Sequence, residues 1–189
     1  MPHVAQAYVA GTPEAEVIGQ AVSAFVDNME AETISPILPK HGFDNINPDK
    51  WYPHQNWLNV LQDMEAEVGG QASMAFVAFG KQVVQSAVMP DTLKTIPDVL
   101  NALHDIHHLN LRNVPDEEGY SLEKRGDTDY IVFHNTPNPD HVIYGFLWGL
   151  AARFKSPSEQ FVVRILPENP RPDICRSAFE VKWGDGSDL

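Results

Sequence analysis

Histidines cluster in one short segment, where imidazole groups could bind a metal ion or carry protons. His104, His107 and His108 are three of the eight histidines and lie within five consecutive residues. On a helix, His107 falls inside the apolar stripe, while His104 and His108 lie one turn apart on its flank. These two could share a metal ion. The pattern also suits a hydrogen-bonded core histidine, His107, beside two partly exposed ones, and the lack of a carboxylate motif favours this second interpretation.

Two glycines mark the helix predicted for residues 139–154. Gly145 and Gly149 are four residues apart, so they share one face of that helix. Glycine in a helix interior costs about 1 kcal/mol relative to alanine, which indicates a packing reason for both. They would form a smooth groove that another element, or a flat ligand, can approach. Close packing of the helix on a sheet is the favoured explanation.

The other residues that could carry chemistry match no catalytic motif. The sequence has no phosphate-binding loop, no Gly-x-Ser-x-Gly elbow and no dinucleotide-binding fingerprint. Cys175 is the only cysteine, which excludes an intrachain disulfide and a cysteine-rich zinc site. A reducing compartment is the simplest interpretation. We therefore predict no catalytic residue and a cytoplasmic location.

Charge and length limit the partners and the domain organisation. The net charge of -13 at pH 7 repels phosphate backbones and anionic membrane surfaces, so we predict neither nucleic acid binding nor membrane insertion. The run Asp116-Glu117-Glu118 is expected to be solvated surface. The 189 residues suit a single domain, 1–189, in which residues 1–11 lack a secretory signal and form a flexible segment.

Helical periodicity dominates the first part of the chain. A first helix is expected to open at Thr12-Pro13-Glu14, and glycines at 69 and 70 are expected to end a second. The expected ranges are residues 12–26, 57–68, 74–84 and 95–110. The last of these begins with a pattern that resembles a capping box, Thr95 to Asp98.

Strand-like segments follow. Residues 120–125 and 128–134 predict a hairpin around Gly126-Asp127, residues 139–154 a helix, and residues 160–166 and 178–183 two more strands. This order predicts an α+β domain, in which N-terminal helices precede a four-stranded antiparallel sheet with one helix inserted between two hairpins.

Three stretches of the second half resemble elements of one known family. Residues 99–106 read VLNALHDI, residues 145–154 read GFLWGLAARF, and residues 173–175 and 179–183 read DIC and FEVKW. The first is similar to the helix that presents the proximal haem histidine in the haem-nitric-oxide/oxygen-binding (H-NOX) superfamily, where that histidine follows a leucine. The second resembles that superfamily's Gly-x-x-x-Gly-Leu-Ala-x-x-Phe helix, and the third its closing strands. The resemblance covers about residues 95–183, and the superfamily includes haem-free 4-vinyl-reductase-type ligand-binding domains.

The resemblance implies His104 as the axial ligand if haem binds. Haem-binding members carry a Tyr-x-Ser-x-Arg clamp for the haem propionates on the strand before the second of these helices. Here that region, residues 133–138, reads FHNTPN and offers no arginine for bidentate pairing with a carboxylate. Its Thr136-Pro137 is more like the haem-free relatives, so we expect the haem-free form to be native.

The leading hypothesis is a non-catalytic sensory or ligand-binding protein with an H-NOX-like fold. A pocket between the fourth helix and the sheet would take a small apolar or flat ligand, and a partner protein would read the signal. The identity of the ligand and the oligomeric state are left open. The predicted ligand-binding residues are Leu100, Leu103, His104, His107, Phe146 and Gly149.

Two alternatives come from other classes of function. One is a haem-based sensor of NO or O2 with His104 as proximal ligand. The other is a metal-dependent hydrolase using His104, Asp105 and His108, because a His-Asp doublet holds the metal that activates water in metal-dependent phosphohydrolases. Those enzymes are helical throughout, whereas four strands are predicted here.

Overall fold

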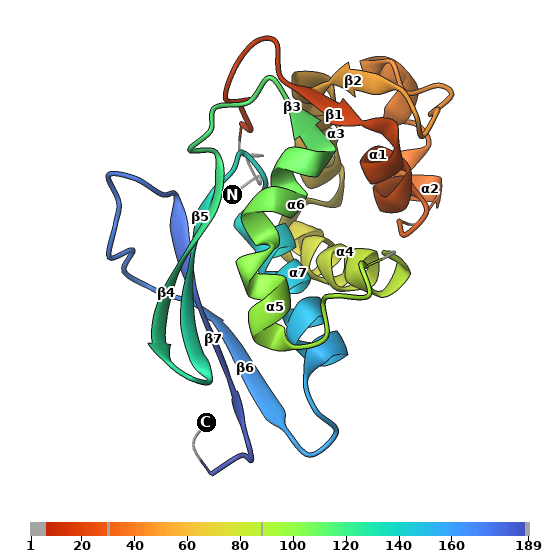
Figure 1. The fold of residues 1–189 in the computed structure, drawn as a ribbon. Coiled ribbons are helices and arrows are strands. Elements are labelled where there is room, and N and C mark those ends of the chain that lie inside the picture. The colour runs from red at the N-terminus through yellow and green to blue at the C-terminus, as the bar shows by residue number, and fades with distance from the viewer. Residues whose placement is uncertain (1–6, 30, 88, 188–189) are drawn as a thin grey trace.

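A mostly helical N-terminal half and a sheet-based C-terminal half meet along helices α4 and α7 in the computed structural model (Figure 1). The structure describes residues 7–29, 31–87 and 89–187. The N-terminal half contains β1 (Glu16–Ile18), α1 (Gly19–Val26), α2 (Ala31–Ile34), η1 (Leu38–His41), β2 (Trp51–Pro53), α3 (His54–Val68), η2 (Gly69–Gln71) and α4 (Ala72–Ser86). The C-terminal half contains α5 (Ile96–Asn101), α6 (Leu103–Asn110), β3 (Leu111–Arg112), β4 (Gly119–Gly126), β5 (Asp129–Asn135), α7 (Asp140–Phe154), β6 (Gln160–Ile165) and β7 (Ser177–Gly184).

The predicted four-stranded antiparallel sheet is confirmed, with strand order β4-β5-β7-β6. α7 is inserted between the hairpins β4–β5 and β6–β7, as predicted. The helices lie on one side of this sheet (Figure 1). Apolar side chains of α5, α6, α7 and the sheet form one buried cluster, which includes Leu100, Leu103, Val132, Leu147 and Phe179.

The first predicted helix begins later than expected. Helix α1 starts at Gly19, and residues 16–18 form the strand β1, which pairs with β2 and β3 in a small antiparallel sheet. Thr12 caps no helix, because its hydroxyl donates to the backbone oxygen of Asn113. Strands of two or three residues are too short to show a period of two, so the sequence did not predict this sheet.

The fourth predicted helix is divided in two. Its capping box is confirmed, because Thr95 Oγ1 accepts from the Asp98 amide at 3.3 Å and the Asp98 carboxylate accepts from the Thr95 amide at 3.0 Å. The helix then turns at Ala102, so α5 and α6 are separate elements. No glycine or proline marks the break in the sequence.

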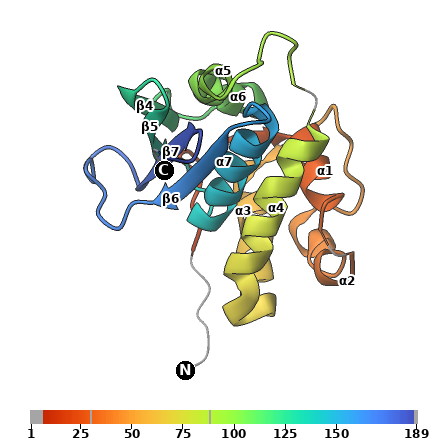
Figure 2. The same ribbon diagram turned by 90° about the horizontal axis from the view of Figure 1, so that it is seen from below.

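The glycine face of α7 packs on a helix and not, as expected, on the sheet. A Cβ on Gly145 would collide with the backbone oxygen of Val77, and one on Gly80 with that of Val142. Figure 2 shows α4 and α7 side by side. Close approach of two backbones therefore explains both glycines of α7.

The residues before β1 are packed where the structure describes them. Tyr8 is buried, its hydroxyl donates to Glu65 at 2.8 Å, and Gln55 bonds to the backbone of Tyr8 and Ala10. Of the predicted flexible segment, residues 1–6 lie outside the described residues, whereas residues 8–10 are held by α3. None of the helices in the described ranges is long and apolar enough to cross a membrane.

Candidate functional site

A buried histidine–carboxylate pair lies between α6 and the start of β4. The Nε2 of His107 and the Oε1 of Glu118 are 3.1 Å apart, and the side chains are only 4% and 6% exposed. The sequence interpretation of His107 as a hydrogen-bonded core residue is confirmed. Glu118, in contrast, is not the solvated surface residue that its acidic run predicted. It is buried because its carboxylate accepts a hydrogen bond that a buried imidazole N–H requires.

The other two histidines of α6 contact the same short segment. His108 Nε2 donates to the backbone oxygen of Glu118 at 2.8 Å. His104 lies against Gly119, where an added Cβ would be 2.6 Å from its Nδ1. Gly119 has φ +142, a conformation that L side chains rarely adopt. All three histidines of the cluster therefore hold α6 against residues 118–119.

A fourth histidine extends this cluster into the N-terminal half. His54, the first residue of α3, is buried, and its Nδ1 has no hydrogen-bond partner among the described residues. Burial lowers the pKa of His54 to about 4, which the nearby Glu118 opposes and His107 reinforces. An uncharged imidazole is thus favoured where the two halves meet.

A second buried network joins the end of β5 to α7. The Nε2 of His134 lies 2.6 Å from Thr136 Oγ1, and its Nδ1 lies 3.1 Å from Ser177 Oγ, which donates to Asp140 at 2.8 Å. The Asn138 amide donates to Thr136 Oγ1. Burial lowers the pKa of His134, although Asp140 opposes the shift. Hydrogen bonds from His134 and Ser177 outweigh the burial of Asp140 and lower the pKa of its carboxyl group.

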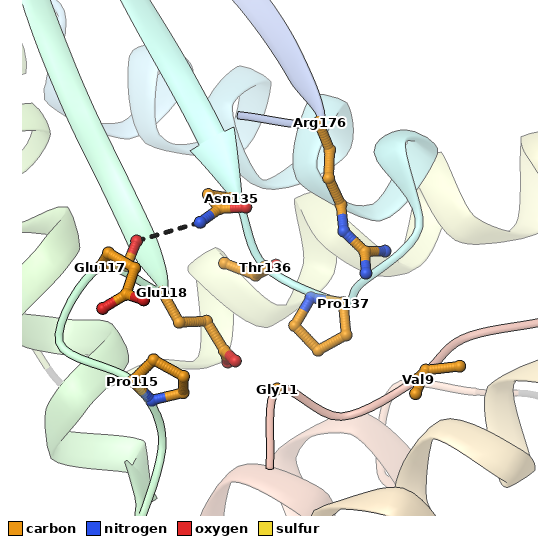
Figure 3. A pocket seen from close by; sticks show the side chains of 9 residues that line it. All are labelled: Val9, Gly11, Pro115, Glu117, Glu118, Asn135, Thr136, Pro137 and Arg176. Carbon is orange, nitrogen blue, oxygen red and sulfur yellow. Dashed lines mark hydrogen bonds between the residues drawn. The ribbon is translucent and has the colours of Figure 1, made fainter. Parts of the chain in front are cut away.

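These two networks border one pocket, which we call the junction pocket (Figure 3). Its volume is about 140 Å³. Glu118 of the first network and Thr136 of the second lie in its wall. The lining residues are Val9, Gly11, Pro115, Glu117, Glu118, Asn135, Thr136, Pro137 and Arg176.

A second pocket, of about 350 Å³, lies at the other end of the sheet. Its walls come from the start of α5, the end of α7 and the β4–β5 turn. They carry both lysines and carboxylates, with Lys94, Lys155, Asp127 and Glu159 among them.

None of the six predicted ligand-binding residues lines either pocket. Leu100 and Leu103 are buried in the cluster beneath the sheet, and Phe146 is partly buried against it. A Cβ on Gly149 would contact Lys81 and Val84 of α4. His104 and His107 are brought together with residues 118–119, as described above. The role of the six in ligand binding stays a prediction.

The sequence did not predict a functional role for Glu118, His134, Thr136, Ser177 or Arg176. Four of these are buried polar residues, and Arg176 lies just before β7. Their roles depend on contacts between separate elements, such as His134 of β5 with Ser177 of β7, which are 43 positions apart. One local signal was present, because His134 and Thr136 are two residues apart at the end of a predicted strand and so share a face.

The geometry of the α6 histidines gives little support to a metal site. The rings of His104 and His108 are 4.5 Å apart, but Asp105 is exposed. Across the described ranges, no group of three or more His, Cys, Asp or Glu side chains is arranged to hold a metal ion.

The comparisons with known proteins identify the fold. An H-NOX protein from S. oneidensis, in its Fe(II)NO ligation state, superposes with a TM-score of 0.64 at 14% identity, over 88% of this chain and 99% of that one. A K. algicida H-NOX mutant superposes with a TM-score of 0.63 at 13% identity, over 90% of this chain and 98% of that one. An oxygen-binding H-NOX domain related to soluble guanylate cyclases superposes with a TM-score of 0.60 at 11% identity, over 87% of this chain and 92% of that one. No protein-family model and no curated protein matches the sequence. The chain therefore has an H-NOX-like fold, as its motifs predicted.

The residues around His104 do not fit a haem group. Its imidazole lies against Gly119 and the ring of His108, so α6 is closed against the start of β4. Leu100 and Leu103 are each 1% exposed, so the adjoining space is filled by packed side chains. The segment after β5 carries Thr136-Pro137, with no arginine before α7.

Proposed function

We propose that this chain is a non-catalytic ligand-binding protein that senses a small molecule in the junction pocket without haem. The observation that carries this proposal is the position of Glu118. Its side chain lines the pocket, and the same carboxylate bonds to the buried His107 of α6. A ligand that contacts Glu118 therefore acts directly on the residue that holds α6 in place.

The pocket also joins the two halves of the fold. Val9 and Gly11 come from the segment before β1, whereas Asn135 ends β5 and Arg176 directly precedes β7. A ligand bound there would contact both halves at once. A change in their arrangement would follow if the ligand binds one arrangement more tightly than another. A partner protein that reads the position of α6 would complete the signalling role.

The polar walls favour this pocket over the space between α5–α6 and the sheet as the ligand site. That space holds Leu100 and Leu103 in a closed core, whereas the junction pocket is open and carries side chains that can form hydrogen bonds. Ligand sites combine an enclosed surface with a few well-placed polar groups.

The hydrogen-bond geometry supports a binding role and not a catalytic one. The chain Thr136–His134–Ser177–Asp140 has the order of a nucleophile, a base and an orienting carboxylate. Thr136, however, is 1% exposed, and its hydroxyl already accepts from the Asn138 amide. A hydroxyl held in this way is poorly placed to attack a substrate, so the network acts to fix the shape of the pocket wall.

The test is a binding screen of the full chain against small polar metabolites by isothermal titration calorimetry. Val9→Trp should narrow the mouth of the pocket, because Val9 lines it and is 62% exposed. The matched control is Met74→Trp on α4, where the methionine is 69% exposed. We expect a compound that binds saturably to the unmodified chain and to Met74→Trp but at least about tenfold more weakly to Val9→Trp. No saturable binder, or equal affinity in both variants, would contradict the proposal.

A further inference from the structure

Opposite charges face each other across the junction pocket. Figure 3 shows Arg176 on one side and Glu117 and Glu118 on the other. Arg176 directly precedes β7, and the two glutamates directly precede β4, so the fold brings these charges together from distant parts of the chain. The pocket therefore offers separate sites for a negative and a positive group.

Arg176 differs from the other five arginines. Arg112, Arg125, Arg164 and Arg171 each form an ion pair with a glutamate, and Arg153 donates to the backbone oxygens of Val84 and Ala87. Within the described ranges, the guanidinium of Arg176 takes part in no hydrogen bond or ion pair. A free guanidinium at a pocket wall has the planar donor fork that suits a carboxylate.

The wall opposite Arg176 carries carboxylate oxygens of Glu117 and Glu118 that can accept hydrogen bonds from a ligand. Glu118 Oε1 bonds to His107, whereas Oε2 faces Gly11, which also lines the pocket. Glu117 accepts from Asn135 through its backbone oxygen, and its side-chain carboxylate forms no ion pair in the part of the chain that the structure describes. Carboxylate oxygens of this kind can accept the N–H donors of an ammonium group.

The size and the remaining walls restrict the ligand further. A cavity of about 150 Å³ accommodates a molecule the size of benzene, and the junction pocket is about 140 Å³. Val9, Pro115 and Pro137 supply apolar surface between the charged walls. A short carbon frame with a charge at each end would meet all three surfaces.

We propose that the junction pocket binds a small zwitterion of the amino-acid class, with its carboxylate on Arg176 and its ammonium group on Glu117 and Glu118. This inference rests on the proposed ligand-binding function and names the ligand class. A simple anion would face two carboxylates, and a simple cation would face the unpaired guanidinium. Only a ligand with both charges has a partner on each side.

The experiment compares ligands that share a carbon frame but differ in charge. The probes are the twenty amino acids, β-alanine and 4-aminobutyrate, followed by analogues of the tightest binder. If β-alanine binds, for example, β-alaninamide lacks the carboxylate and propionate lacks the ammonium group. We expect each analogue to bind at least about tenfold more weakly, because hydrogen bonds to charged groups contribute strongly to binding.

Variants of the protein test each end separately. Arg176→Gln should abolish the preference for the zwitterion over the amide, and Glu117→Gln should abolish the preference over the analogue without nitrogen. Arg125→Gln, at an arginine paired with Glu123 on the hairpin, is the matched control and should keep both preferences.

The outcomes separate this inference from the proposed function. Binding of only neutral or singly charged compounds, still lost in Val9→Trp, would leave the ligand-binding function standing and overturn the zwitterion. A zwitterion that binds equally well to Arg176→Gln and to the unmodified chain would also overturn it. Absence of any saturable binder would overturn both.

Discussion

The carboxylate of Glu118 accepts from His107 at 3.1 Å in the interior, although Glu118 closes a run of three acidic residues. Glu118→Ala should lower the free energy of unfolding by on the order of 3 kcal/mol, because it leaves a buried imidazole without its partner. Urea denaturation measures this loss. Glu118→Gln keeps an acceptor and should lose less.

The neighbour of Glu118 provides the control. Glu117 is exposed, so Glu117→Ala should change the free energy of unfolding by no more than about 0.5 kcal/mol. Equal effects of the two alanine substitutions would show that the pair with His107 contributes little.

The stability of the fold should fall in mild acid. Burial lowers the pKa of His54 from its ordinary value of 6.5 to about 4, so between these values the unfolded chain binds a proton that the folded chain excludes. Stability is therefore full above about pH 6.5 and is lost as the pH falls towards 4, by about 3 kcal/mol for the whole shift. The lowered pKa of His134 acts in the same direction.

Denaturation at pH 7.5 and pH 4.5 measures this dependence. His54→Gln should reduce the difference between the two pH values, whereas His141→Gln, at an exposed histidine, should leave it unchanged. A pH dependence that is identical in all three proteins would exclude His54 as its source.

The sequence predicted the sheet far better than the site. Alternating apolar residues and a Gly-Asp turn are local signals, and they placed all four strands of the large sheet within two residues. Glu118 and Arg176 carry no such signal, because their roles depend on which loops meet at the end of the sheet. The apolar stripe of the helix predicted the buried position of His107, but nothing in the sequence predicted Glu118 as its hydrogen-bond partner.

The close packing of α4 and α7 predicts that Gly145→Ala and Gly149→Ala destabilise the fold to different extents. A Cβ on Gly145 would collide with the Val77 carbonyl, whereas one on Gly149 would lie 3.1 Å from its nearest neighbours. Gly145→Ala should therefore destabilise the chain by about 1–3 kcal/mol, and Gly149→Ala by less, since alanine also favours the helix. Thermal denaturation of the two variants checks the order, and a larger loss for Gly149→Ala would contradict this packing.

Leu103 tests whether the space beside α6 is filled. It is 1% exposed, so Leu103→Trp should cost about 1–3 kcal/mol or more through overpacking. Leu109 on the same helix is 75% exposed, and Leu109→Trp should be nearly neutral. If Leu103→Trp were as stable as Leu109→Trp, a cavity would have to exist beside His104, which would support a ligand pocket between α5–α6 and the sheet.

Haem binding provides the sharpest contrast with the H-NOX proteins of similar fold. We expect the chain, purified from cells supplied with a haem precursor, to show no Soret band, because His104 is closed against Gly119 and no arginine stands between β5 and α7. An H-NOX protein prepared in parallel controls for haem supply, and added haem should give the unmodified chain and His104→Ala the same spectrum. A Soret band at near-stoichiometric haem that disappears in His104→Ala would establish His104 as an axial ligand and overturn the haem-free proposal. A band that survives in His104→Ala would place the haem ligand elsewhere and overturn it equally.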